Sequence, residues 1–378
     1  MSPVMMCNVI DWRRQLEAIN RLQAQQRYAE VEALCRRHLA NLLTAPAGLV
    51  IQVKLQSHLI QSLAAQARYH EAQAQLQSAQ ATLGDIKAVY SINISLPLEL
   101  KILSQQGELL RIQGRYAQAA QIFQQTLQRA EEHGLRRQPC WMTLLNDLAI
   151  AYKYWGRFDE AENLYQTALV ELIQSHGEQH IEVAAIYHNL AGLNHARRHH
   201  AEAEPYARKS YQLHVDLLGP QHAKTIADGA ALGSILHGLK RWDEAILYFE
   251  TAIAFFEQQF GPVHYEIAIN LNNLAASLQA KGEFEQAKQA YCRALEIKEI
   301  LLGVNHPDVA ISLNNLASLL QQTNQLAKAK GRFKRAISIF EASIGLNHPN
   351  TKLCRKNAAG SLSRTRVDQI DRLCTVQI

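Results

Sequence analysis

A period of 42 residues runs through most of this chain and strongly limits the folds that it can adopt. Its clearest copy covers residues 305–345, which read NHPDVAISLNNLASLLQQTNQLAKAKGRFKRAISIFEASIG. Internal repeats of this length are typical of arrays in which each unit packs only on its neighbours. Three columns keep the period: Leu148, Leu190, Leu232, Leu274 and Leu316; His180, His222, His264, His306 and His348; and Gly177, Gly219, Gly261, Gly303 and Gly345.

Each regular unit is expected to form two antiparallel helices, because apolar residues recur at helical spacing on both sides of a break at Thr323–Asn324. Pro307 and Asp308 suit the opening turn of the first helix. Gly345 is expected to end the second helix in the left-handed conformation. Small residues are expected where two helix backbones approach each other, in the column Ala161, Ala203, Ala245, Ala287 and Ala329.

The composition fits tightly packed helices, with 48% hydrophobic and 7% aromatic residues and a formal net charge of +5. Six cysteines are scattered without a CxxC pair, as expected for reduced thiols. The chain has no apolar run of the roughly 20 residues that a membrane helix needs. The start, MSPVMMCNVIDWRR, also lacks the features of a signal peptide. We therefore expect a cytoplasmic protein without a membrane partner.

The repeated motif resembles a known family. The order leucine, small residue, Gly-x-aromatic and Glu-Ala resembles the tetratricopeptide repeat, and the 42-residue length with LNNLA and HPDVA is similar to the kinesin light chain type. Clear copies include GRFDEAENLYQTAL at 156–169 and GEFEQAKQAYCRAL at 282–295. The resemblance implies an all-α fold, a right-handed superhelical α-solenoid of about eight antiparallel helix pairs. It also implies that the first helices of the pairs line a concave groove.

Earlier copies of the motif are less regular, which determines the expected domain organisation. GRYAQAAQIFQQTL at 114–127 keeps the period, whereas ARYHEAQAQL and QRYAEVEAL lie outside it. VYSINIS suggests an ordered loop or a slight bend over 87–95. We expect two divergent helix pairs over residues 1–95 and six repeats over 96–345, the last five of them regular. A capping helix is expected over 346–365 and a disordered tail over 366–378.

The sequence contains no phosphate-binding loop, GxSxG motif or glycine-rich dinucleotide fingerprint, so we expect neither an enzyme nor a cofactor. The histidine column does not predict a shared metal site. Equivalent positions in adjacent helices lie about 8 to 10 Å apart, whereas zinc–nitrogen bonds are about 2.0 to 2.1 Å long. These histidines are instead expected to cap helices or to pack. His195, His199 and His200 are interpreted as part of a polar turn, and no metal site is expected.

The candidate ligand-binding residues occupy columns of the first helices, on either side of the repeated leucine. Asparagine can pair with any peptide backbone, because it both donates and accepts hydrogen bonds. The resemblance assigns peptide contact to the position before the leucine, which Asn189, Asn273 and Asn315 match and Ala231 does not. The column five residues after the leucine changes from cationic to neutral along the chain. The expected groove residues are Lys101, Arg111, Asn146, Lys153, His188, Asn189, His195, His237, Asn272, Asn273, Asn314 and Asn315.

These columns favour a non-enzymatic scaffold that binds a peptide segment or a partner protein in its groove. The cations and the small residues between them suit an acidic ligand with one aromatic side chain. Two alternatives remain open. A peptide-sensing regulator would act through its convex surface. A nucleic-acid-binding repeat protein would use the basic segment after residue 352 and the Arg197–Arg198 turn, although the rest of the chain is nearly neutral and does not favour nucleic acid.

Overall fold

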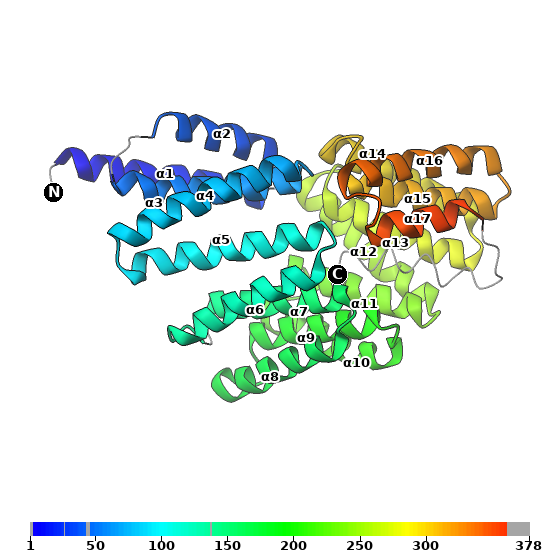
Figure 1. The fold of residues 1–378 in the computed structure, drawn as a ribbon. Coiled ribbons are helices and arrows are strands. Elements are labelled where there is room, and N and C mark those ends of the chain that lie inside the picture. The colour runs from blue at the N-terminus through cyan, green and yellow to red at the C-terminus, as the bar shows by residue number, and fades with distance from the viewer. Residues whose placement is uncertain (1–2, 26, 43–45, 137, 361–378) are drawn as a thin grey trace. The chain divides into compact units, whose positions relative to one another are not determined.

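The computed structural model describes residues 3–25, 27–42, 46–136 and 138–360, and there the chain forms seventeen α-helices. It divides into two compact units, residues 1–151 and residues 152–378. Within each unit, successive helices run side by side (Figure 1). None of the helices in the described ranges is both long enough and apolar enough to cross a membrane. The all-α repeat fold predicted from the period is confirmed.

The first unit holds the less regular copies. Its helices are α1 (Pro3–Ala24), α2 (Tyr28–Ala40), α3 (Pro46–Ala65), α4 (Tyr69–Val89), α5 (Ile92–Ile112), α6 (Tyr116–Glu132) and most of α7 (Pro139–Trp155). The loop expected over 87–95 is wrong in extent, because only Tyr90 and Ser91 separate α4 from α5. Ser91 has extended backbone angles and provides the N-cap position, so the helical pattern resumes at once.

The second unit holds the regular copies. Its helices are α8 (Phe158–His176), α9 (Ile181–Ala196), α10 (His200–Leu218), α11 (Ala223–Gly238), α12 (Trp242–Phe260), α13 (Tyr265–Lys281), α14 (Phe284–Leu302), α15 (Pro307–Gln322), α16 (Leu326–Ser343) and α17 (Pro349–Ala358). An ion pair between Arg355 and Glu341 joins α17 to α16 at 2.7 Å. The tail expected over 366–378 lies outside the described residues.

The histidine column supplies the N-cap of five helices, as predicted. In each case Nδ1 of the ring accepts a hydrogen bond from the backbone N–H two residues later, at 3.1 to 3.3 Å. A helix leaves its first N–H groups without partners inside the helix, and the imidazole satisfies one of them. The helices that begin this way are α9, α11, α13, α15 and α17.

The glycine column takes a positive φ, and Gly345 has φ 88°, as expected. Gly177 has φ 80° and ψ 171°, and Gly219, Gly261 and Gly303 are similar. These values are extended rather than left-handed helical, and this region is essentially restricted to glycine. At these four glycines the chain leaves the second helix directly as an extended segment that leads to the next histidine cap.

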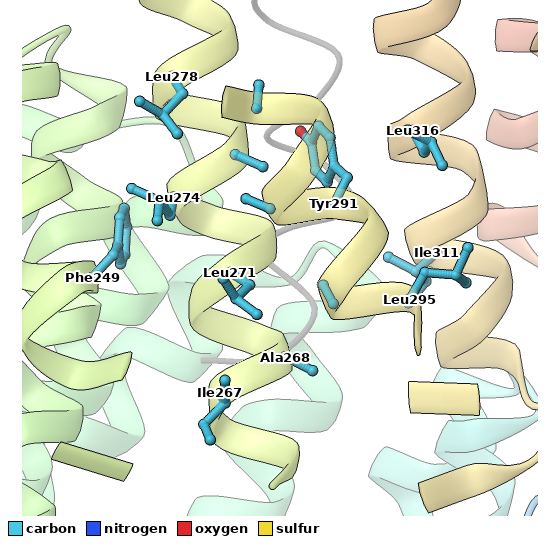
Figure 2. Close-up of a cluster of buried hydrophobic side chains, with 14 of the residues drawn as sticks. Phe249, Ile267, Ala268, Leu271, Leu274, Leu278, Tyr291, Leu295, Ile311 and Leu316 are labelled. Atoms are coloured by element: carbon cyan, nitrogen blue, oxygen red, sulfur yellow. The ribbon is translucent and has the colours of Figure 1, made fainter. Parts of the chain in front are cut away.

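The core of the second unit lies between successive helix layers. Figure 2 shows Phe249 of α12 facing Leu274 of α13, with Tyr291 of α14 and Leu316 of α15 in the same cluster. The predicted small column is buried where backbones approach, since Ala203, Ala245 and Ala287 are all 0% exposed. Each layer therefore covers the apolar face of the one before it, which is how a repeat array builds a continuous core.

Candidate functional site

Five side-chain hydrogen bonds each join a first helix to the first helix of the next repeat. We call these five pairs the polar ladder. In each pair the two residues are 40 or 43 positions apart, close to one repeat. The pairs are Ser104–Asp147 at 2.8 Å, His188–Asp228 at 2.8 Å, His237–Ser277 at 2.9 Å, Asn272–Ser312 at 3.1 Å and Asn314–Asn357 at 3.1 Å. The first pair belongs to the first unit and the other four belong to the second.

The ladder includes several residues that the sequence placed in the groove, so their side chains are directed toward a neighbouring helix. Asn272, Asn314 and His237 are buried in this way, with exposed fractions of 5%, 2% and 8%. His195 and Asn315 are also buried. The remaining expected groove residues are more accessible: Lys101 is exposed, and Arg111, Asn146, Lys153, His188, Asn189 and Asn273 are half-buried.

In the first unit, the expected cationic residues surround a carboxyl group that the repeat pattern did not single out. Burial raises the pKa of Asp147 to about 6, and the negative charge of Glu108 acts in the same direction. The hydrogen bond from Ser104 and the charges of Arg111 and Lys101 only partly oppose this shift. Asp147 stands in the column that carries asparagine in later repeats, so the carboxyl takes the place of a neutral amide.

In the second unit, Asp228 of α11 accepts hydrogen bonds from three neighbours. Nδ1 of His188 and Nδ1 of His214 each lie 2.8 Å from its carboxylate, and Ser210 Oγ donates to it as well. Burial alone would raise the pKa of Asp228, but the bonds from both histidines outweigh it and lower the pKa to about 2. The sequence signal was present, because Asp228 stands in the column of Asn270 and Ser312, but the partners could not be identified from spacing.

The same cluster does not form a nucleophile activated by a base. Ser210 hydrogen-bonds to the carboxylate of Asp228 and lies 2.9 Å from the carbonyl of Ala184, with no bond from its hydroxyl to a histidine among the described contacts. A catalytic serine needs an adjacent base that takes its proton. Here both Ser210 and His214 point at one carboxylate. The cluster is therefore suited to joining α9, α10 and α11 rather than to hydrolysis.

The turn that contains Arg197 and His199 was interpreted from the sequence as polar. Arg197 pairs with Asp159 at 2.7 Å and also with Glu162, both on α8. His199 lies 3.2 Å from Glu202, and Nδ1 of His200 lies 3.1 Å from Nδ1 of His195. These contacts describe a polar turn whose main cation already has acidic partners.

A cluster that the sequence did not predict lies between α8 and α9. His176, His180 and Glu182 each place one potential metal ligand atom within 4.8 Å of the others. The periodic pattern identified His180 as a member of the histidine column. His176 lies outside that column, so the pattern did not identify it. The signal that could have found the cluster is the departure from the repeat at position 176.

Comparison with known proteins gives a family match and several similar folds. The tetratricopeptide repeat model matches residues 98–169, 142–216, 182–258, 225–300 and 266–342. No curated protein matches the chain. A solved Rap protein complexed with Competence and Sporulation Factor is 16% identical, with a TM-score of 0.50 over 93% of this chain and 97% of its own.

Two other solved structures have slightly lower TM-scores. BtubC (BKLC) from P. vanneervenii is 22% identical, with a TM-score of 0.48 over 61% of this chain and 91% of its own. NprR in complex with its cognate peptide NprX is 14% identical, with a TM-score of 0.49 over 94% of this chain and 86% of its own. At these identities the likeness concerns the fold alone.

Proposed function

Because this chain belongs to the tetratricopeptide repeat family, we propose that it is a non-enzymatic scaffold that binds a peptide segment or a partner protein. The proposed binding surface is the face formed by the first helices of the repeats, within the second unit. The family fold and the accessible amide and cationic side chains on these helices support this proposal. The Rap protein that shares the fold was solved with a bound factor, which also supports binding through such an array.

The observation that carries the proposal is the position of Asn189 and Asn273 next to ladder residues. Asn189 follows His188 on α9, and Asn273 follows Asn272 on α13. Bonds to Asp228 and Ser312 hold His188 and Asn272, so the ladder fixes the backbone that presents each half-buried amide. Side chains positioned by a rigid support bind with a smaller loss of conformational freedom. The two amides can then pair with the backbone of one extended ligand.

The buried members of the expected groove set have a different role in this proposal. Asn272, Asn314 and His237 hold neighbouring first helices in place, and the half-buried Lys153, Asn189 and Asn273 of the second unit contact the ligand. Lys153, in the last turn of α7, supplies positive charge, which suits an acidic residue in the ligand. The repeat with Ala231 lacks the amide and should hold the ligand less tightly.

A combined variant tests this proposal, with Lys153→Glu, Asn189→Ala and Asn273→Ala. Its partners are recovered by affinity purification from the source cell and quantified by mass spectrometry against the wild type. A matched control changes exposed residues on second helices instead, with Lys334→Glu, Asn163→Ala and Gln289→Ala. Circular dichroism and thermal melts establish that both variants fold. We expect the first variant to lose its partners and the control to keep them; equal recovery by both folded variants contradicts the proposal.

A regulator that senses a peptide is the second candidate. The structural similarity to the Rap protein extends over 93% of this chain. It therefore includes the less regular repeats as well as the regular ones. In that case ligand binding alters the affinity of the second-helix surface for another protein. Measuring that affinity with and without saturating ligand distinguishes the candidates, because a simple scaffold predicts no change. The nucleic-acid alternative is less well supported, since Arg197 already pairs with Asp159 and Glu162.

A further inference from the structure

The junction between α8 and α9 brings two imidazoles and a carboxylate together at the surface. His176 ends α8, His180 is the N-cap of α9, and Glu182 lies in the first turn of α9. The ring centroids of the two histidines are 4.5 Å apart. One potential ligand atom from each of the three residues lies within 4.8 Å of the others. His176 is exposed and the other two are half-buried, so a dissolved ion can reach all three side chains.

Position 176 is what distinguishes this junction from the others in the array. The same position carries Leu218, Phe260, Leu302 and Ile344 in the following repeats. The α12–α13 junction is an internal comparison, because the rings of Phe260 and His264 are also 4.5 Å apart. Glu266 occupies the position equivalent to Glu182. In both residues the backbone N–H donates a 3.3 Å hydrogen bond to Nδ1 of the capping histidine. At this position the two junctions differ in one ring, which is the apolar Phe260 in one and His176, with its nitrogen atoms, in the other.

Hydrogen bonds around His176 leave its Nε2 suited to a metal. Ser175 Oγ lies 2.7 Å from the carbonyl oxygen of Glu171 and donates its single proton there. The same oxygen lies 2.8 Å from Nδ1 of His176 and accepts a hydrogen bond from it when the ring carries its proton on Nδ1. The other ring nitrogen then keeps its lone pair. A metal-binding histidine is commonly held in this way, with the second nitrogen bonded to a neighbouring acceptor.

His180 can bind a metal through its Nε2 with the loss of one long hydrogen bond. Its Nδ1 accepts the 3.3 Å hydrogen bond from the Glu182 N–H. A metal on Nε2 moves the ring proton to Nδ1 and releases this long bond. The three ligand atoms must also move closer together, because two ligand atoms at about 2.0 to 2.2 Å from a tetrahedral zinc ion lie about 3.3 to 3.6 Å apart. The exposure of His176 allows this movement.

We propose that His176, His180 and Glu182 form a binding site for a divalent transition metal, with Zn²⁺ as the preferred ion. Two imidazoles and one carboxylate are a common three-residue ligand set for zinc, and the fourth position is left to water or to a side chain of a bound protein. Calcium and magnesium prefer oxygen ligands and are not expected to bind. This site is separate from the proposed ligand-binding residues and does not depend on that function.

Isothermal titration of the metal-free full chain with ZnCl₂ tests the site, with MgCl₂ as the control ion. The decisive variant is His176→Phe, which reproduces the pair of rings already present at the α12–α13 junction. We expect it to weaken zinc binding by about tenfold or more, while its melting temperature without metal stays close to that of the wild type. Zinc should raise the melting temperature of the wild type and have a smaller effect on the variant.

The reciprocal variant Phe260→His should add a second zinc site, because it places a histidine beside His264 and Glu266. An increase of one bound zinc per chain supports the proposal. Equal zinc affinity and stoichiometry in the wild type and His176→Phe would overturn it, as would the absence of zinc binding by the wild type. Glu182→Gln provides an independent reduction in affinity if His176→Phe fails to fold, since the amide removes the charged ligand oxygen.

Discussion

At the scale of single residues, two aspartates in the first helices show how local contacts raise or lower the pKa of a carboxyl group. Asp147 has one hydroxyl partner and a nearby Glu108, and its pKa rises to about 6. Asp228 has two histidine partners, and its pKa falls to about 2. Both lie on the polar ladder. They should therefore give opposite dependences of stability on pH.

Replacing Asp147 with asparagine should stabilise the first unit above pH 6. The folded pKa of about 6 exceeds the ordinary value of 3.8, so the folded state binds the proton more tightly and loses stability as pH rises between these values. The loss is of the order of 1 to 3 kcal/mol. Urea unfolding at pH 5 and pH 8 measures the change. Asp147→Asn should flatten the pH dependence, and a variant less stable than the wild type at pH 8 contradicts this explanation.

Asp228 should have the opposite effect in the second unit. Its folded pKa lies below the ordinary value, so its stabilising contribution is present above about pH 4 and is lost as pH falls toward about 2. Asp228→Asn should lower the free energy of unfolding at pH 7 by about 2 kcal/mol or more, because both histidines lose a charged acceptor. Asp85→Asn is the control, since Asp85 is exposed. Equal unfolding free energies for the two variants would show that the cluster contributes no net stability.

At the scale of the helix pair, the turn between first and second helices requires one residue with positive φ. Its column contains Gly114, Gly156, Arg198, Lys240, Gly282 and Asn324, with φ between 60° and 89°. Residues with a Cβ are disfavoured in the left-handed region by roughly 1 to 2 kcal/mol. Arg198 and Lys240 therefore occupy positions at which glycine is less strained.

Lys240→Gly should raise the free energy of unfolding of the second unit by up to about 1 kcal/mol, because relief of strain exceeds the added freedom of the unfolded chain. The reverse change, Gly282→Lys, should lower it by a similar amount. Thermal or urea unfolding of both variants measures the effect. If Lys240→Gly is destabilising, the side chain of Lys240 makes a contact that outweighs its backbone strain.

Close packing between paired helices gives a further prediction in the first unit. A Cβ on Gly107 would lie 2.6 Å from the ring of Phe123, whereas one on Gly84 meets no atom within 4 Å. Gly107→Ala should therefore destabilise the unit by about 1 to 3 kcal/mol through overpacking. Both glycines lie inside helices, where alanine is more favourable than glycine. Without a clash to oppose this preference, Gly84→Ala should stabilise the unit by up to about 1 kcal/mol. Equivalent changes in the midpoint of unfolding for the two variants would be inconsistent with this packing.

The repeat made the helices of the regular units predictable, because caps, glycines and apolar positions all recur with one period. It was less informative at the junction before α5, where a broken pattern suggested a loop although only two residues separate the helices. Site residues were harder to predict. A column identifies which residues share a helix face, but the partner of Asn272 lies in the next repeat, and whether two such side chains meet depends on the spacing of the packed helices.

At the scale of the whole molecule, the array separates two roles that share the same helices. Apolar and small columns build the core of each unit, and the polar ladder joins successive first helices. The positions that remain accessible beside the ladder, including Lys153, Asn189 and Asn273, are the ones that we propose for ligand contact. The departures from the repeat, such as Asp228 and His176, give individual repeats their distinct chemistry.

Site-specific photocrosslinking in the source cell tests the proposed binding face most directly. A photoreactive amino acid is placed at Asn189 or Asn273 on the first helices, and at Leu247 on α12 as a control, since Leu247 is 64% exposed. If the ligand binds on the first-helix face, the same partner is crosslinked from both first-helix positions and not from Leu247. A partner crosslinked from Leu247 alone, with none from either asparagine position, would contradict it.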